Sequence, residues 1–267
     1  MKRTTIGAIC LAFAAQLHAV SPAAPAPLSA EARGLQIAQE TDRRDAGFEN
    51  SVADATMVLA NRQGDESIRS FRMMTLEQSD DGDKTVAVFD QPADLAGSAV
   101  LTHSHALSAD DQWLYLPAVR RVKRISSRNK AASFMGSEFA FEDLSAWEVR
   151  KYSYRYLREE AFDGADCFVV ENTPAYEDSG YSKQIEWVDR TIYQPRKLEY
   201  YDRQGRLLKT MVFKGYRQYL GRHWRPAEQI MENHQTGRVT RVIWDAYRFK
   251  TDLTPYDFTP DAIARAR

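Results

Sequence analysis

The chain has 267 residues, a formal net charge of −1 and 11 % aromatic residues. A near-neutral charge argues against nucleic acid as a partner, and 43 % hydrophobic residues are too many for a disordered chain. The length suffices for one large or two small domains with a substantial core.

The first residues predict a secretory signal peptide over residues 1–19. Lys2 and Arg3 form a positive start, an apolar stretch of residues 6–17 follows, and Ala19 offers a small residue for cleavage. The stretch is too short to span a bilayer. We expect the periplasm as the compartment. Cleavage would change the formal charge from −1 to −3, because it removes two bases and no acid.

Residues 20–28 are expected to form a flexible Pro-rich leader, and residues 29–267 a single domain. Of the two cysteines, Cys10 follows Ile9 rather than a small residue, so we do not expect it to carry a lipid. Only Cys167 then remains, and one cysteine cannot form an internal disulfide.

Periodicity predicts one helix followed by a long series of strands. Ser29 can cap a helix over about 30–46, which Gly47 can end. Beyond it, apolar residues alternate with polar ones and turn residues separate the segments. The predicted strands are 52–60, 68–78, 85–90, 99–105, 112–116, 119–125, 152–156, 167–171, 184–190, 197–201, 207–213, 228–233 and 238–244.

Residues 126–148 interrupt the strands. Ser137 can cap a short helix over about 137–148, and Thr259 with Pro260 can open a last one. The predicted class is α+β: a single, strongly curved antiparallel sheet of about ten or eleven strands, an incomplete β-barrel, with helices covering the concave face.

No pattern of catalytic residues emerges, so no enzyme and no cofactor are expected. The chain lacks the G-x-S-x-G, H-E-x-x-H and phosphate-loop motifs. His103 and His105 could share a strand face, but no further ligand has metal-site spacing, so no metal is expected. Adjacent acids such as Glu142 and Asp143 are expected in solvent. Cys167, among apolar residues, is expected to be a buried, inert thiol.

A basic run covers residues 120–130. It permits two interpretations: contact with anionic headgroups or an acidic partner, or a solvated strand face that resists edge pairing. The candidate contact residues are Arg120, Arg121, Lys123 and Arg124.

Aromatic and methionine side chains suggest an adaptable apolar pocket, although a plain core would use the same residues. We expect residues 126–147 to form a lid hinged at Gly136, with Phe134 and Met135 at its tip. The candidate cavity and lid residues are Phe134, Met135, Gly136, Phe139, Phe141, Leu144, Trp113 and Trp187.

Several motifs resemble a known family. They are Gln112-Trp-Leu-Tyr-Leu-Pro117, Arg121-Val-Lys-Arg-Ile125, Ser133-Phe-Met-Gly-Ser-Glu-Phe139, Phe141-Glu-Asp-Leu144, Asp83-Lys84 and Phe89-x-x-Pro92-Ala93-Asp94. With them the chain resembles the bacterial outer membrane lipoprotein-sorting proteins, which are similar to the LolA and LolB lipoprotein carriers. The resemblance implies an incomplete barrel that holds acyl chains between sheet and helices, without catalytic residues. It also implies a neighbouring lipid-exporting transporter of the RND type.

The sequence therefore predicts a monomeric carrier that holds the acyl chain of a lipid or lipoprotein and hands it to or from a membrane transporter. The alternative is a lipid-sensing regulatory module of the same fold. Both hypotheses involve binding without chemistry.

Overall fold

The computed structural model describes residues 27–126 and 129–266. The predicted signal peptide, residues 1–19, and most of the predicted leader, residues 20–28, lie outside these residues. The predicted first helix is confirmed as α1 (Ala30–Asp45). The Ser29 hydroxyl accepts a hydrogen bond from the backbone N–H of Ala32, and Gly47 follows the helix with a φ of 95°.

The strands form one antiparallel sheet in the order β6-β5-β4-β3-β2-β1-β15-β14-β11-β10-β9-β8-β7. Its first half consists of β1 (Asn50–Ala60), β2 (Glu66–Leu76), β3 (Lys84–Gln91), β4 (Ala99–His103), β5 (Asp111–Leu116) and β6 (Arg121–Ile125). Its second half consists of β7 (Tyr152–Phe162), β8 (Ala165–Pro174), β9 (Tyr181–Asp189), β10 (Pro195–Asp202), β11 (Leu207–Lys214), β14 (Glu228–Asn233) and β15 (Arg238–Phe249).

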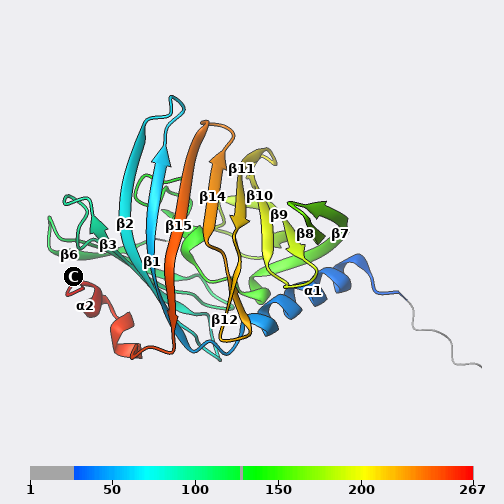
Figure 1. The fold of residues 1–267 in the computed structure, drawn as a ribbon, viewed down its shortest axis with the longest axis horizontal. Coiled ribbons are helices and arrows are strands. Elements are labelled where there is room, and N and C mark those ends of the chain that lie inside the picture. Colours follow the sequence, from blue (N-terminus) through cyan, green and yellow to red (C-terminus); the bar gives the residue numbers. More distant parts are fainter. Residues whose placement is uncertain (1–26, 127–128, 267) are drawn as a thin grey trace, which may run out of the picture.

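The predicted class, an α+β protein with one curved and unclosed antiparallel sheet, is confirmed. The sheet bends around the chain segment that joins its two halves, and β6 and β7 remain as unpaired edges (Figure 1). Register shifts in β1, β2 and β7 add local twist, which helps a long meander to curl. The sheet has 13 strands, one for each of the predicted segments, so only the total of about ten or eleven was too low.

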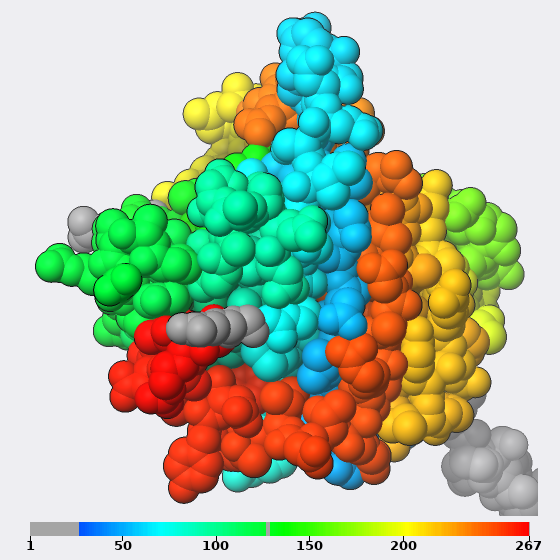
Figure 2. Space-filling view, turned by 60° about the vertical axis from the view of Figure 1, so that its left-hand side comes forward, coloured from blue at the N-terminus to red at the C-terminus, as the bar shows by residue number. Residues whose placement is uncertain are grey.

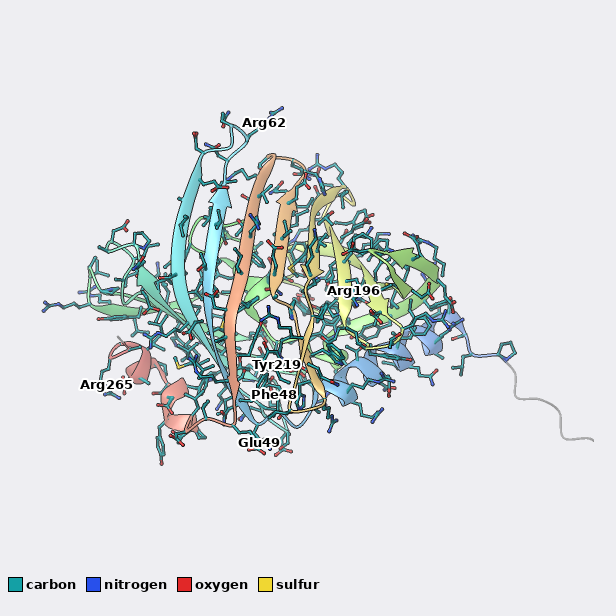
Figure 3. The ribbon with its side chains drawn as sticks, in the orientation of Figure 1. Phe48, Glu49, Arg62, Arg196, Tyr219 and Arg265 are labelled. Atoms are coloured by element: carbon teal, nitrogen blue, oxygen red, sulfur yellow. The ribbon has the colours of Figure 1, made fainter. Side chains whose placement is uncertain are left out.

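A further two-stranded hairpin was not predicted, because its strands have only three residues each. It consists of β12 (Arg217–Tyr219) and β13 (His223–Arg225). Phe48 and Tyr219 lie close together at the base of the sheet (Figure 3). Both contact Phe249, with ring centroids 6.4 and 5.4 Å apart. These rings hold the hairpin against the lower rim of the sheet.

The helix predicted over 137–148 is wrong. The structure has the 3₁₀ turn η2 (Phe141–Leu144) inside this range and a second 3₁₀ turn, η3 (Val149–Lys151), directly after it. Ser137 caps no helix; its hydroxyl donates to the carbonyl of Phe134 at 2.7 Å. We call residues 129–151 the central segment. Hydrogen bonds to the sheet hold it in place, so it needs no α-helix to satisfy its backbone.

The prediction that helices cover the concave face holds for α1 but not for the C-terminus. The 3₁₀ turn η4 (Pro255–Phe258) and the short helix α2 (Pro260–Ile263), capped by Thr259, pack on the convex face. Phe258 and Ile263 are buried there against Val86, Val88 and other outward residues of β2 to β5. Figure 2 shows this segment lying on the outer surface.

The concave face carries the main core. Side chains from β1 to β4, from β9 to β11 and from β14 and β15 meet Phe134, Phe139 and Phe141 of the central segment in one cluster. At the other end, Ile37 and Ala38 of α1 pack on β7 to β9. The space between these two covers is the site described next.

Candidate ligand cavity

A cavity of about 1400 Å³ lies between the concave face of the sheet, α1 and the central segment. It exceeds the ~300–1,000 Å³ typical of small-molecule sites. Alternate residues of several strands face it, such as Val170 and Asn172 of β8 and Met211 and Phe213 of β11, and the hairpin β12–β13 contributes Trp224 and Arg225. The volume therefore exists because the central segment covers only part of the concave face.

α1 lies close to the sheet at one wall of the cavity. A Cβ atom on Gly34 would stand 2.8 Å from the backbone nitrogen of Tyr156, so only glycine permits this approach. The guanidinium of Arg33 lies over the Tyr156 ring, 3.8 Å from its centroid, and bonds Glu159. These contacts fix the helix across β7.

The central segment is anchored by buried carboxylates. Glu142 accepts hydrogen bonds from the Tyr176 and Ser179 hydroxyls, both at 2.5 Å, and from the Gly180 backbone at 2.8 Å. Asp143 forms a buried ion pair with Lys209 at 2.6 Å. The expectation that Glu142 and Asp143 are solvated is wrong, because they satisfy polar groups beneath the segment.

A second buried cluster ties the end of the segment to the sheet. Asp110 lies 2.5 Å from the ammonium of Lys151 and 3.7 Å from that of Lys130. These cations lower the pKa of Asp110, although its burial acts in the opposite direction. The segment is thus held by several buried charges as well as by apolar packing.

Several acidic side chains that form no ion pair within residues 27–126 and 129–266 line the cavity. Burial raises the pKa of Asp83 to about 7, and neighbouring carboxylates such as Glu148 and Glu77 add to it. Burial also raises the pKa values of Glu148 and Asp42. On the sheet, burial raises the pKa of Glu186 to about 7, while a hydrogen bond from Asn172 opposes the shift.

Of the predicted cavity and lid residues, Leu144 lines the cavity. Phe134, Phe139 and Phe141 are buried in the core cluster beside it, Phe134 with only 1 % of its surface exposed. Met135 packs against the same cluster. Gly136 has a φ of 74°, and its carbonyl accepts a hydrogen bond from Arg238 at 2.8 Å. A lid role for these residues stays a prediction, and it would require the segment to move.

The two predicted tryptophans lie on the convex face. Trp113 stands against His103, with ring centroids 5.0 Å apart, and packs beside the C-terminal segment. Trp187 is 3 % exposed and lies under the ammonium of Lys197, 3.4 Å from the ring centroid. Neither belongs to the residues that line the cavity.

The residues facing the cavity from β8 and β9 were not singled out from the sequence. They are Val170, Asn172, Gln184, Glu186 and Val188. The alternation in residues 184–190 is visible, but Ile185 and Trp187 point outward. No sequence signal distinguishes the two faces, because apolar residues occupy both.

The basic residues lie at the edge strand β6 and the turn before it. Arg121 and Lys123 alternate along the strand and are exposed, while Arg124 on the other face bonds Asp111. Arg120 occupies the turn with a φ of 49°. Within residues 27–126 and 129–266, Arg120, Arg121 and Lys123 form no ion pair.

The two histidines have different partners. His105 bonds Asp81 at 2.6 Å, and His103 bonds the carbonyl of Phe258 at 2.8 Å. Among the described residues, no group of three His, Cys, Asp or Glu side chains is arranged to hold a metal ion. Cys167 is buried, and burial raises the pKa of its thiol to about 11. No helix of the described chain is long and apolar enough to cross a membrane.

A curved, unclosed antiparallel sheet with a covered cavity on its concave face defines the LolA-like class of incomplete barrels. The chain is similar to an outer membrane lipoprotein-sorting protein domain from Vibrio parahaemolyticus, with 51 % identity, 87 % of this chain and 99 % of that chain covered, and a TM-score of 0.86. The chain belongs to this lipoprotein-sorting family.

Two further solved structures are similar to the chain. A DUF1329 family protein from Desulfovibrio piger is 30 % identical over 88 % of this chain and all of that chain, with a TM-score of 0.83. A LolA superfamily protein from Nitrosomonas europaea shares the fold at 24 % identity, 88 % and 99 % coverage and a TM-score of 0.69. A family model described as "Uncharacterized protein" matches residues 81–265. No curated protein matches the chain.

Proposed function

We propose that this protein is a periplasmic carrier that holds the acyl chain of a lipid or lipoprotein in the cavity beneath α1. The observation that carries this proposal is the cavity itself, whose lining includes Leu144, Leu198, Met211 and Phe213. Burying an acyl chain contributes about 0.8 kcal/mol per CH₂ group, so a partly sheltered chain binds without any covalent step. Residues 29–267 act as a single, monomeric half-barrel domain in this proposal.

The carrier binds rather than transforms its ligand, and a membrane transporter is the donor or acceptor. The described residues favour binding because the histidines and Cys167 lie apart, and the acids of the central segment already hold structural partners. Arg120, Arg121 and Lys123 are proposed to meet an anionic membrane or an acidic partner during transfer, since they are exposed at one sheet edge.

A cavity-filling variant tests the carrier function. Thr75 is half-buried on β2 and lines the cavity, so Thr75→Trp fills part of the volume. Ser153→Trp is the matched control, because Ser153 is exposed on β7 between two cavity-facing tyrosines and points away. Binding of a fluorescent fatty-acyl probe should weaken at least about tenfold in the first variant and remain unchanged in the second.

Native mass spectrometry of the protein from its own periplasm, followed by lipid extraction, would identify the ligand. Equal probe binding by both folded variants, or the absence of any co-purified lipid together with no probe binding, would contradict the carrier function. Retention of the ligand in the presence of acceptor vesicles would favour the sensor over the carrier.

A further inference from the structure

The cavity has a polar floor on β8 and β9. Asn172 and Gln184 face each other across the two strands, and Glu186 stands two residues further along β9 on the same face. We call these three residues the polar floor. All three line the cavity.

The polar floor contains two buried oxygen atoms that accept no hydrogen bond from the described residues. Asn172 is 0 % exposed and Gln184 is 4 % exposed, and their side-chain oxygens Oδ1 and Oε1 accept no hydrogen bond from residues 27–126 or 129–266. The Asn172 amide nitrogen donates to Oε2 of Glu186 at 2.8 Å, which fixes the orientation of the amide. Unpaired buried acceptors are rare in folded proteins, because each costs free energy.

Glu186 forms no ion pair with any cation in the part of the chain that the structure describes. Asn172 is the one hydrogen-bond partner of its carboxylate among the described residues, and no charged side chain there shifts its pKa. Tyr154, Tyr200 and Tyr216 also line the cavity, and after burial the Glu186 charge is among the causes that raise the pKa values of their hydroxyls. A carboxylate among aromatic rings is an environment suited to a cation.

Acidic residues outnumber basic residues in the cavity lining. It contains twelve acids, Asp42, Asp45, Glu49, Glu77, Asp80, Asp81, Asp83, Asp110, Glu142, Asp143, Glu148 and Glu186, against the three bases Arg150, Lys151 and Arg225. Pairing removes charges of both signs, since Lys151 contacts Asp110 and Arg225 contacts Asp45, each at 2.5 Å, and Lys209 contacts Asp143. With the pairs of Asp81 and Glu49 also set aside, seven lining acids form no ion pair among the described residues, against Arg150 alone among the lining bases. The cavity therefore favours a positively charged ligand group over a carboxylate or phosphate.

We propose that the polar floor of Asn172, Gln184 and Glu186 binds the primary ammonium group of an amphiphilic ligand whose chain occupies the rest of the cavity. An ammonium carries three N–H donors and no acceptor, which matches the three acceptors of the floor. The Glu186 carboxylate forms the charge-assisted bond, and the two amide oxygens take the remaining donors. The inference rests on the proposed carrier function and specifies the chemistry of the ligand.

A series of ligands with the same chain tests the proposal on the unaltered protein. Dodecylammonium, dodecanol and dodecanoate are titrated by calorimetry at about pH 8, below their critical micelle concentrations. Dodecylammonium should bind at least about tenfold more tightly than dodecanol, and dodecanoate more weakly than both. Dodecyltrimethylammonium, which has no N–H donor, should bind more weakly than dodecylammonium.

The variant Glu186→Gln keeps an acceptor for Asn172 and removes the charge. It should reduce the preference for dodecylammonium over dodecanol to about threefold or less, while dodecanol affinity stays the same. Glu66→Gln is the control with the same charge change, since Glu66 is exposed on β2 and lies outside the cavity.

Two results would overturn the inference in distinguishable ways. Equal affinities for the three head groups, or a preference that survives in folded Glu186→Gln, would refute ammonium recognition and leave the carrier function intact. Failure of every twelve-carbon ligand to bind would refute both proposals.

Discussion

Replacing Glu186 by glutamine should stabilise the protein at alkaline pH and leave it unchanged in acid. The pKa of Glu186 rises from 4.5 to about 7 because the carboxylate is buried without a cation. The folded protein therefore holds this proton more tightly than the unfolded chain does. Stability from the neutral carboxyl is present below pH 4.5 and is lost as the pH rises from there through about 7.

The size of the expected stabilisation follows from the shift in the pKa of Glu186. A shift from 4.5 to about 7 corresponds to about 3 kcal/mol between the ionised and neutral forms. At about pH 8 the ionised Glu186 carboxylate lowers the free energy of unfolding of the wild-type protein by nearly this full amount. At about pH 5 it lowers that free energy by less than ~1 kcal/mol. Glutamine is neutral throughout and can still accept the hydrogen bond from Asn172, so the gain in Glu186→Gln should reach about 1–3 kcal/mol at pH 8.

Urea unfolding followed by circular dichroism at about pH 5 and pH 8 measures this difference. Glu66→Gln serves as the control, because its exposed side chain should change stability by less than ~0.5 kcal/mol at both values. An equal change in Glu186→Gln at the two pH values, or a loss at pH 8, would refute the assignment of an uncompensated carboxylate. Added dodecylammonium should instead stabilise the wild-type protein more than the variant at pH 8.

Three further changes test other parts of the structure. Gly34→Ala places a methyl group against the backbone of β7 and should cost about 1–3 kcal/mol in chemical unfolding, with earlier proteolysis of α1; an unchanged midpoint would contradict the close approach. Lys209→Met leaves Asp143 buried without its cation and should cost about 3–5 kcal/mol, whereas a neutral result would show that the pair is dispensable. Arg121→Glu combined with Lys123→Glu should abolish salt-dependent binding to anionic vesicles without unfolding the chain; unchanged binding would favour the solvated-face interpretation.

The elements of the fold could be predicted well because the local signals are strong. Ser29 and Gly47 mark the ends of α1, and alternation with turn residues marks every strand of the sheet. The hairpin β12–β13 was missed because strands of three residues carry no measurable periodicity. The predicted helix in the central segment was wrong because the apolar spacing of Phe141 and Leu144 serves a 3₁₀ turn fixed by buried carboxylates.

The site was harder to predict than the fold. Alternation shows that two faces of a strand differ, but not which face lies inside a curved sheet. In β9 the aromatic Trp187 lies on the convex face and the polar Gln184 and Glu186 line the cavity, the reverse of a simple apolar-in pattern. The convex face has its own apolar clusters, under the C-terminal segment and around Cys167, and these remove the contrast that sequence reasoning needs.

The pairing of β1 with β15 has a consequence for how the chain folds. Most neighbouring strands in the sheet are also neighbours in sequence, so each half can form through short loops. The seam between the halves is different, because it places Ser51 opposite Phe249 and ends with Ala60 opposite Val239. The loop that this pairing closes runs from Ala60 to Val239. Closing such a long loop is entropically costly, and contacts between residues far apart in sequence form slowly. Two locally assembled meanders that dock along one late seam are the folding route that this topology favours.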